Sequence, residues 1–550
     1  MVEYSILPSI FYSFLFTFGV GLQKNYIMKS TTSKYLFKKI LFLPLFFLSF
    51  SVKAQDATQK LSRFYEILNQ HYVENINDNE LTEVAIKSIL SELDPHSSYI
   101  SSEDVAKFQT SRDGEFKGVG ILFSMISDTA TVSTVYHDSP ANKAGLLKGD
   151  KIVSIDNQSV IGFDSDKVGG LLKGASGTQV KLGVVRNEKL SNFDITRGSV
   201  LPSIKTYYKI NDTTAFIVVS RFSHTTMREF SDAFYEMKNI RALILDLRGN
   251  GGGMIAEALK LANFFLKKGT LLGSNKGQSV PSSNYVAEND SGFDGKLIVL
   301  ADENTASASE LFLGAVQDWD RAVIVGRRTF GKAMIMQNFN LPDGSLIEIT
   351  NSYNYTPSGR SIQRVYDKNK KEDYRNTIWE RYDENFIDSI DRSLPEYKTL
   401  KLSRSVYGRD GIYPDFYVKT PSGWLNPYTL ELLKNWIINN YIESYVEENK
   451  TELLKKYSSF QSFNQSFNIT SQMIEEIVRA AEEKGIPKDA INLKKGEDYI
   501  KFKSKSMIIE TLWSIKELYM FAESVDPDMI RAKEILTDWD KLVKNKEVAE

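Results

Sequence analysis

The chain has 550 residues, 42% of them hydrophobic and 25% charged, which is ordinary for a globular protein with two or three hydrophobic cores. A net charge of -2 gives no electrostatic reason to expect a nucleic-acid partner, and the absence of cysteine excludes thiol nucleophiles, thiolate metal sites, disulfides and lipid-modified cysteine. The four histidines lie far apart and form no HExxH pair, so no zinc site is expected and catalysis must use hydroxyl, carboxylate or amine groups.

The first 54 residues are predicted to be a targeting segment. From Met28, a lysine-rich start precedes an apolar run at 40–50, and Val-Lys-Ala at 52–54 places small residues at the two positions that a signal peptidase reads. The apolar run is too short for a comfortable membrane span. We expect cleavage after Ala54 and export to a bacterial periplasm, where disulfides are permitted but not required. The apolar stretch at 5–22 leaves an alternative, a retained membrane anchor, unless Met28 is the true start.

The remaining chain divides into four predicted regions. Residues 55–113 form an N-terminal helical region, since apolar residues recur at three- and four-residue spacing before a Pro-marked turn at 93–101. Residues 114–199 are short alternating runs separated by Gly, Asp and Asn turns, which predicts a β-rich domain. Residues 200–425 alternate apolar strands with helices, which predicts a largely buried, mainly parallel sheet. Residues 426–550 are a charged helical extension in which we find no catalytic motif.

The predicted core contains a buried strand that runs into consecutive glycines, "LDLRGNGGG" at 245–253. Such a loop ahead of a helix exposes backbone N–H groups and forms an anion site. A plain strand–helix turn explains the pattern equally well. The loop lacks the Lys-Ser/Thr ending of a phosphate loop, which disfavours nucleotide binding.

The next strand leads into "TASASE" at 305–310. A serine at a helix N-terminus lies where the helix dipole and free N–H groups stabilise an oxyanion. The simpler alternative is that Thr305 or Ser307 only caps the helix.

A lysine follows in "VGRRTFGKAMIMQ" at 325–337. Period-two spacing is expected to place Phe330, Met334 and Met336 on the strand face of Lys332. An amine among apolar side chains has a lowered pKa and can act as a neutral base. A solvated lysine is the ordinary alternative, but with no histidine in reach Lys332 is the plausible partner of a nucleophilic serine.

Together these stretches resemble the C-terminal processing peptidases, also called tail-specific proteases, which are serine endopeptidases with a Ser–Lys dyad and an inserted PDZ domain. The resemblance runs from about residue 60 to 425. It includes "LDPHSSYI" at 93–100, "GVGILF" at 118–123, "SPANKAGLLKGDKIVSIDNQ" at 139–158, the three core motifs, "YTPSGRSIQ" at 355–363 and "VYGRDGIYPDFYV" at 406–418. The fold class that we expect is therefore α/β and multidomain: a mixed α/β protease core, an inserted β-rich PDZ domain, an N-terminal helical segment and a helical C-terminal extension.

The resemblance also implies roles for single residues. Ser307 would be the nucleophile and Lys332 the general base. The backbone N–H groups of Ala308 and of Gly252 or Gly253 would form the oxyanion hole. Asp318 matches an additional acid described in some members, but three helical turns, roughly 16 Å, separate it from Ser307, so a supporting role is expected. The PDZ loop of Gly118, Val119, Gly120 and Ile121 would bind a substrate's terminal carboxylate.

The sequence departs from the family pattern after the lysine. The family usually has glutamine four residues further on, where this chain has Met336, and Gln337 follows on the opposite face of a regular strand. This substitution leaves two rival interpretations: a PDZ scaffold with a weak or inactive protease core, and a ligand-binding relative of the same fold. The intact Ser307–Lys332 pair argues against both.

We therefore expect an exported serine endopeptidase whose PDZ domain guides cleavage at or near the C-termini of proteins. The expected partners are protein or peptide substrates with accessible C-termini. No cofactor, metal or nucleic acid is implied, and the sequence specifies neither an adaptor or activator nor a homo-oligomer.

Overall fold

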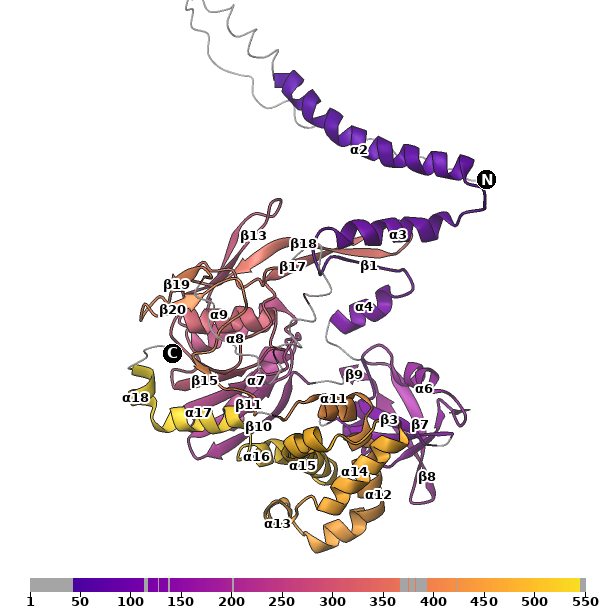
Figure 1. Ribbon diagram of the computed structural model, residues 1–550, viewed down its shortest axis with the longest axis vertical. Helices are drawn as coiled ribbons and strands as arrows, with labels where there is room; N and C mark the ends of the chain where they lie inside the picture. Colours follow the sequence, from indigo (N-terminus) through magenta and orange to yellow (C-terminus); the bar gives the residue numbers. More distant parts are fainter. Residues whose placement is uncertain are drawn as a thin grey trace, which may run out of the picture. The chain divides into compact units, whose positions relative to one another are not determined.

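The computed structural model describes residues 43–112, 117–126, 128–136, 139–199, 202–366, 374, 381, 393–421 and 423–544 (Figure 1). The chain forms two compact units, 1–83 and 84–550. In the first unit, helix α2 (Leu43–His71) continues through the cleavage point expected after Ala54, and α3 (Asp78–Ser91) follows. Residues 1–42 of the predicted targeting segment lie outside the described residues. Within the described ranges, no helix has both the length and the apolar character that crossing a membrane requires.

The second unit contains the β-rich insert. Its sheet has the order β3–β4–β5–β7–β8, β6 pairs with β5, and the outer pair β2–β9 joins the two ends of the insert. The strands are β2 (Lys117–Gly118), β3 (Ile121–Ile126), β4 (Thr129–Val135), β5 (Lys151–Ile155), β6 (Gln158–Ser159), β7 (Gln179–Arg186), β8 (Lys189–Thr196) and β9 (Gly198–Ser199). Helices α5 (Pro140–Ala144) and α6 (Ser165–Leu172) complete a separate core that includes Val132, Ile152 and Leu182.

The second unit is built around a six-stranded sheet of order β10–β11–β12–β15–β16–β21. Its first pair is antiparallel and the others are parallel, which confirms the mainly parallel sheet expected from the apolar strands. The strands are β10 (Ile204–Asn211), β11 (Thr214–Val219), β12 (Ala242–Asp246), β15 (Lys296–Ala301), β16 (Val323–Gly326) and β21 (Phe416–Tyr417).

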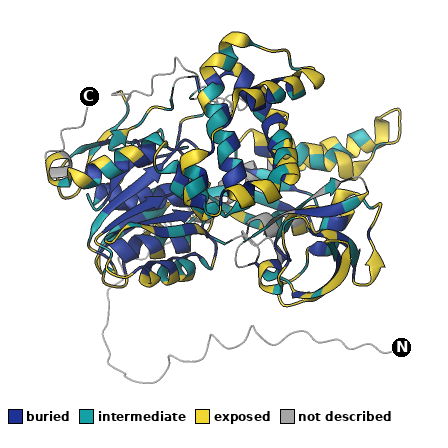
Figure 2. Ribbon diagram, turned by 90° about the horizontal axis from the view of Figure 1, so that it is seen from below, coloured by how far each residue is buried: buried dark blue, intermediate teal, exposed yellow. Residues whose placement is uncertain are grey.

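Helices cover both faces of this sheet. Alternate strand residues point to opposite faces, so Ile217 and Leu245 join one core whereas Phe216 and Ile244 join the other. The first face is covered by α7 (Thr226–Glu236), α8 (Ile255–Phe265) and α9 (Ala308–Asp318). The second is covered by α16 (Ile515–Ala522) and α17 (Pro527–Thr537) of the C-terminal extension. Figure 2 shows the strands in dark blue between these helices.

The second unit also contains a smaller, antiparallel sheet of five strands. Strand β18 pairs with β1, β13 and β17, and β14 extends the sheet from β13. Its strands are β1 (Ser98–Ile100), β13 (Leu271–Lys276), β14 (Ser283–Val286), β17 (Met334–Asn340) and β18 (Leu346–Tyr355). Strands β13 and β14 were not predicted from sequence. A helix, α4 (Val105–Arg112), and a hairpin of β19 (Glu396–Lys398) and β20 (Ser405–Tyr407) complete this part.

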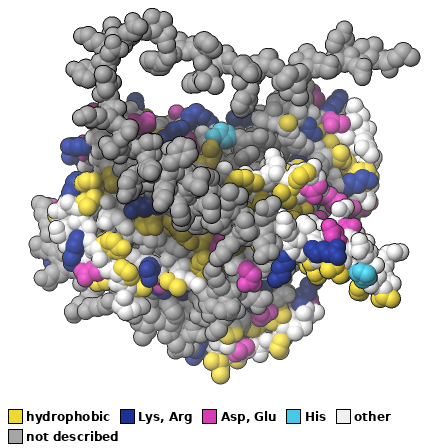
Figure 3. Space-filling model, turned by 90° about the horizontal axis from the view of Figure 1, so that it is seen from above, with side chains coloured by type: hydrophobic (Ala, Val, Ile, Leu, Met, Phe, Trp, Pro, Cys, Tyr) yellow, Lys and Arg dark blue, Asp and Glu magenta, His cyan; other side chains and the backbone are white. Residues whose placement is uncertain are grey.

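The expected helical extension is present and has its own core, which includes Ile438, Phe463 and Ile508. Its other helices are α11 (Pro427–Lys434), α12 (Ile437–Lys456), α13 (Phe460–Ser466), α14 (Ser471–Glu483), α15 (Ala490–Leu512) and α18 (Trp539–Lys544). On the face shown in Figure 3, basic and acidic side chains of the described residues are interspersed, in keeping with the small net charge.

Candidate active site

Ser307 lies at the turn between β15 and α9, where it is the N-cap residue of the helix. Its backbone φ of 59° and ψ of -116° lie outside the regions that a residue with a Cβ ordinarily adopts. A residue whose backbone is held in a sparsely populated conformation beside a pocket is frequently a functional residue.

The structure separates the three hydroxyl groups of "TASASE". Thr305 Oγ1 donates a hydrogen bond to the carbonyl oxygen of Leu247 at 2.9 Å, and Ser309 Oγ donates to that of Asn250 at 3.0 Å. Both side chains are fully buried and tie the turn to the chain after β12. Ser307, in contrast, lines a pocket.

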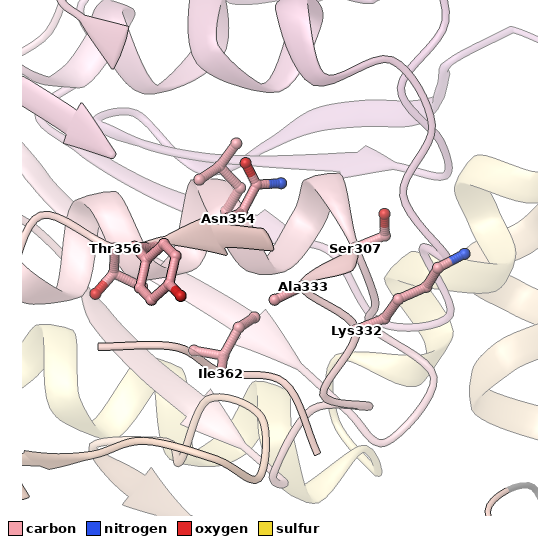
Figure 4. A pocket seen from close by; sticks show the side chains of 8 residues that line it. Ser307, Lys332, Ala333, Asn354, Thr356 and Ile362 are labelled. Atoms are coloured by element: carbon pink, nitrogen blue, oxygen red, sulfur yellow. The ribbon is translucent and has the colours of Figure 1, made fainter. Parts of the chain in front are cut away.

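Ser307 and Lys332 line the same small pocket, whose volume of about 10 Å³ has room for about one water molecule. They lie side by side at one end of it, whereas Thr356 lies at the other (Figure 4). The remaining lining residues are Leu311, Ala333, Asn354, Tyr355 and Ile362. The pocket is therefore lined by apolar and polar side chains, and Ser307 and Lys332 reach it from separate parts of the chain.

Lys332 does not belong to a strand, and the predicted strand face that it shares with Met334 and Met336 is wrong. Strand β17 begins at Met334, because the backbone N–H of Lys332 donates to the Glu310 carboxylate at 2.8 Å instead of to a neighbouring strand. Met334 and Met336 do share a face, since the Oγ1 of Thr350 donates to both sulfur atoms, but neither lines the pocket.

Gln337 is exposed, and its side-chain oxygen accepts a hydrogen bond from Asn351 at 2.6 Å. The pairing of β17 with β18 contains one irregularity, between Ile335 and Met336, where the partner residue changes from Ser352 to Thr350 and skips Asn351. The extra residue therefore belongs to β18, and β17 keeps the alternation that places Met336 and Gln337 on opposite faces.

Glu310 connects the two residues of the pocket and was missed by the sequence analysis. Its Oε2 accepts hydrogen bonds from the backbone N–H groups of Ser307 and Lys332, each at 2.8 Å. Its Oε1 accepts from the backbone N–H of Gly331 at 2.7 Å and from the Thr329 hydroxyl. The spacing of serine and glutamate three residues apart at a helix start, which is typical of a capping box, was the available signal.

The Glu310 side chain is completely buried. Burial raises its pKa to about 7, and the four hydrogen bonds that it accepts act in the opposite direction. One carboxyl group thus holds the backbone of both Ser307 and Lys332.

The glycine loop approaches Ser307 closely. A Cβ placed on Gly252 would lie 2.7 Å from the Ala306 carbonyl oxygen and 2.8 Å from the Ser307 Cβ. The Gly252 N–H donates to the side-chain oxygen of Asn250 at 2.9 Å, so this N–H is already used. The N–H groups of Gly253 and Ala308 have no hydrogen-bond partner among the described residues, which leaves them available to a ligand.

Comparison with known proteins identifies the domains around this pocket. Residues 213–369 match peptidase family S41, 118–196 match a PDZ domain, and 49–104 match the activating protease CtpB N-terminal domain. Residues 428–514 match a family of unknown function, DUF8443. This set of matched domains supports the resemblance to the C-terminal processing peptidase family.

Individual relatives are similar to this chain over about half of its length. A probable CtpA-like serine protease of Staphylococcus haemolyticus is 34% identical over 55% of this chain and 62% of its own length. One of Staphylococcus aureus is 32% identical over 56% and 63%. The chain thus spans less than two thirds of the length of these relatives. The solved photosystem II D1 C-terminal processing protease is 27% identical over 55% of this chain and 83% of its own, with a TM-score of 0.36.

Asp318 lies at the far end of α9 from Ser307. Its fully buried carboxylate pairs with the equally buried Arg360, with 2.8 Å between Oδ1 and Nη2, and its Oδ2 accepts the N–H of Ser358 at 2.9 Å. Asp318 therefore anchors the loop between Thr356 and Ile362, two residues that line the pocket.

The region matched to a PDZ domain includes Gly118 to Ile121, the loop for which carboxylate binding was predicted. The carbonyl oxygens of this loop are occupied: that of Val119 accepts the N–H of Ala141 at 2.7 Å, and that of Gly120 accepts the N–H of Tyr136 at 3.0 Å. Strand β3, which follows the loop, is an edge strand of the described sheet. Elsewhere in the described residues, no group of three or more His, Asp or Glu side chains is placed to hold a metal ion.

Proposed function

We propose that this protein is a serine endopeptidase that cleaves protein substrates at or near their C-termini. The observation that carries the proposal is the shared pocket of Ser307 and Lys332, whose backbone N–H groups bind one buried carboxyl group, that of Glu310. This observation supports the proposal because nucleophilic acyl transfer uses a hydroxyl, a base and backbone N–H donors, and Ser307, Lys332, Ala308 and Gly253 could supply them.

In the proposed reaction, Ser307 Oγ attacks the carbonyl carbon of the scissile peptide bond while neutral Lys332 takes the hydroxyl proton. The N–H groups of Ala308 and Gly253 stabilise the resulting oxyanion. The C–N bond then breaks, Lys332 returns the proton to the leaving amine, and an ester to Ser307 remains. Lys332 next removes a proton from water as the water oxygen attacks the ester carbonyl carbon. The bond from that carbon to Ser307 Oγ then breaks, Lys332 returns the proton to Oγ, and the second product leaves with its new carboxyl group.

The PDZ domain supports the second half of the proposal, the preference for C-termini. Because β3 is an edge strand, a peptide can extend the sheet along it, with its terminal carboxylate at the backbone N–H groups of residues 118–121.

We also propose that the protein acts after export to the periplasm, on the basis of the lysine-rich and apolar pattern that ends at Ala54. N-terminal sequencing of protein purified from its native host should find a mature start near Gln55. Recovery of an intact segment 5–50 in the membrane fraction would contradict this proposal.

Cleavage of a model protein with an apolar C-terminus tests the activity. The wild-type protein should cleave it, Ser307→Ala and Lys332→Ala should not, and all three should give the same far-UV circular dichroism spectrum. Ser309→Ala is the matched control, because its hydroxyl is a buried structural donor to Asn250, and it should retain much of the activity. If Ser307→Ala cleaves normally, the proposed nucleophile is wrong.

Peptides with a free or an amidated C-terminus test the role of the PDZ domain. The peptide with the free C-terminus should have a lower KM than the amidated peptide, because amidation removes the negative charge that the loop is proposed to bind. Deletion of residues 114–199 should remove this difference. Equal KM values for both peptides in the intact protein would exclude capture of the terminal carboxylate.

A further inference from the structure

Two partly buried arginines follow strands β12 and β16 of the central sheet, which lie on either side of β15, and both bind the same carboxylate. Arg248 begins the glycine loop after β12, and Arg327 follows β16. The Oδ2 of Asp528 lies 2.9 Å from Nη1 of Arg248 and 3.2 Å from Nη1 of Arg327. Asp528 belongs to the C-terminal extension, in the first turn of α17, and its side chain is 3% exposed.

The other contacts of the two arginines are separate. The Arg248 guanidinium makes a forked pair with Asp246, with 3.0 Å from Nε to Oδ1 and 2.8 Å from Nη2 to Oδ2, and also contacts Asp526 at 2.7 Å. Arg327 pairs through Nε with Glu303 at 2.8 Å. Asp528 is therefore a carboxylate that both guanidinium groups contact directly, and removing it would leave two like charges close together at a partly buried position.

The cap of α17 holds Asp528 in this position. Asp526 is the N-cap residue, its side chain accepts the backbone N–H groups of Asp528 and Met529, and Pro527 begins the helix. Met529 on the next position is buried in the core against the central sheet. The contact is thus part of the packing of α17 on the sheet, and not a loose surface ion pair.

Each arginine leads into one half of the pocket. After Arg248, the carbonyl oxygen of Asn250 accepts the N–H of Ala306 at 3.0 Å, and the loop continues to Gly253. After Arg327, the N–H of Phe330 donates to the carbonyl oxygen of Thr305 at 3.0 Å, and Lys332 follows. We therefore expect a substitution that moves the two arginines to displace both Gly253, the proposed oxyanion donor, and Lys332, the proposed base.

We propose that Asp528 is a positioning residue for the proposed peptidase reaction, which it serves by fixing the relative placement of the glycine loop and the Lys332 loop through Arg248 and Arg327. The inference rests on the proposed function. It assigns a role in the active site to the C-terminal extension, in which the sequence showed no catalytic motif.

The test compares Asp528→Asn with Asp538→Asn in the full chain, using a peptide substrate with a free apolar C-terminus. Asp538 ends the same helix, is exposed and undergoes the same chemical change, so it is the matched control. Asp528→Asn should lower kcat by roughly tenfold to a hundredfold while KM changes less than about twofold, because Asp528 lies outside the pocket but controls groups that act in the transition state. Asp538→Asn should leave both constants unchanged.

Arg327→Gln provides a second variant in case Asp528→Asn does not fold, and it should likewise lower kcat at constant KM. If both single variants fold, the double variant should be little worse than the poorer single one, because both changes break the same connection. Additive losses, a change in KM alone, or wild-type kcat in the folded variants would overturn the proposal. Ser307→Ala distinguishes failure of the proposed function from failure of the proposed role of Asp528. If Ser307→Ala is inactive while Asp528→Asn and Arg327→Gln keep wild-type kcat, the proposed function is supported and the role of Asp528 is wrong.

Discussion

At the scale of single residues, Glu310 connects the backbone at Ser307 to the backbone at Lys332. Its carboxyl group accepts hydrogen bonds from the backbone of Ser307, Gly331 and Lys332 and from the Thr329 hydroxyl, so it replaces the strand partners that this part of the chain lacks. Since a buried donor without an acceptor costs about 1–3 kcal/mol, the loss of this one acceptor would affect several groups at once.

Glu310 should make stability depend on pH. Burial raises its pKa from 4.5 to about 7, so the folded chain holds this proton more tightly than the unfolded chain does. The stabilisation from this proton is complete below pH 4.5 and is lost as the pH rises to about 7, by at most about 3 kcal/mol. An amide cannot titrate, so the unfolding free energy of the wild type relative to Glu310→Gln should be lower at pH 8 than at pH 5.

Urea unfolding at the two pH values measures this difference. Glu452→Gln, at an exposed position, is the control and should show no such change relative to the wild type. A difference that stays constant, or that grows toward pH 8, would mean that the four donors keep the carboxylate ionised throughout.

At the scale of elements, the glycines of the loop between β12 and α8 differ in their tertiary contacts. These consecutive glycines look equivalent in the sequence, but Gly252 has a φ of 100° and lies against Ser307, whereas a Cβ on Gly251 would meet nothing within 4 Å. The close approach of this loop to the start of α9 places Gly252 against Ala306, Ser307 and Ala308.

Gly252→Ala and Gly251→Ala should therefore behave differently. The first should lower kcat/KM by at least about a hundredfold, because the added methyl group must push the loop away from Ser307 by distances that matter for alignment. The second should retain most of the activity. Peptidase assays with purified, folded variants check this, and an inactive Gly251→Ala beside an active Gly252→Ala would refute the loop geometry.

At the scale of the whole molecule, the C-terminal extension is a layer of the core. Helix α17 packs Met529, Ala532 and Ile535 against the face of the central sheet that α7, α8 and α9 leave open. A sheet whose strands are buried on both faces needs both layers, which explains why a segment so far along the chain packs beneath the protease core.

Ile535→Ala should consequently destabilise the protein by about 2–5 kcal/mol, as for other fully buried aliphatic residues. Ile530→Ala, on the same helix but 39% exposed, is the matched control and should cost less than about 1 kcal/mol. Denaturant unfolding followed by circular dichroism measures both. Equal effects would show that α17 is not part of the cooperative core.

The elements and motifs of this protein followed from local patterns. The parallel strands β11, β12 and β15 were visible as apolar runs, and the helices after them as three- and four-residue spacing, because burial on both faces or on one face imposes those periods on the sequence itself. The motifs around Ser307 and Lys332 were visible for the same reason, since each lies within one strand–turn–helix segment or one loop.

Contacts between distant segments could not be read in this way. Only the tertiary structure showed that Lys332 precedes its strand, that the N–H of Gly252 is used by Asn250, and that Glu310 binds both halves of the pocket. It also decided that β13 pairs with β18 and that Asp528 reaches Arg248 and Arg327. Apart from the local bond between Gly252 and Asn250, each of these depends on hydrogen bonds or ion pairs between residues far apart in the chain. Such pairings leave no periodic trace in the sequence, because any surrounding residues can support them once the fold brings the partners together.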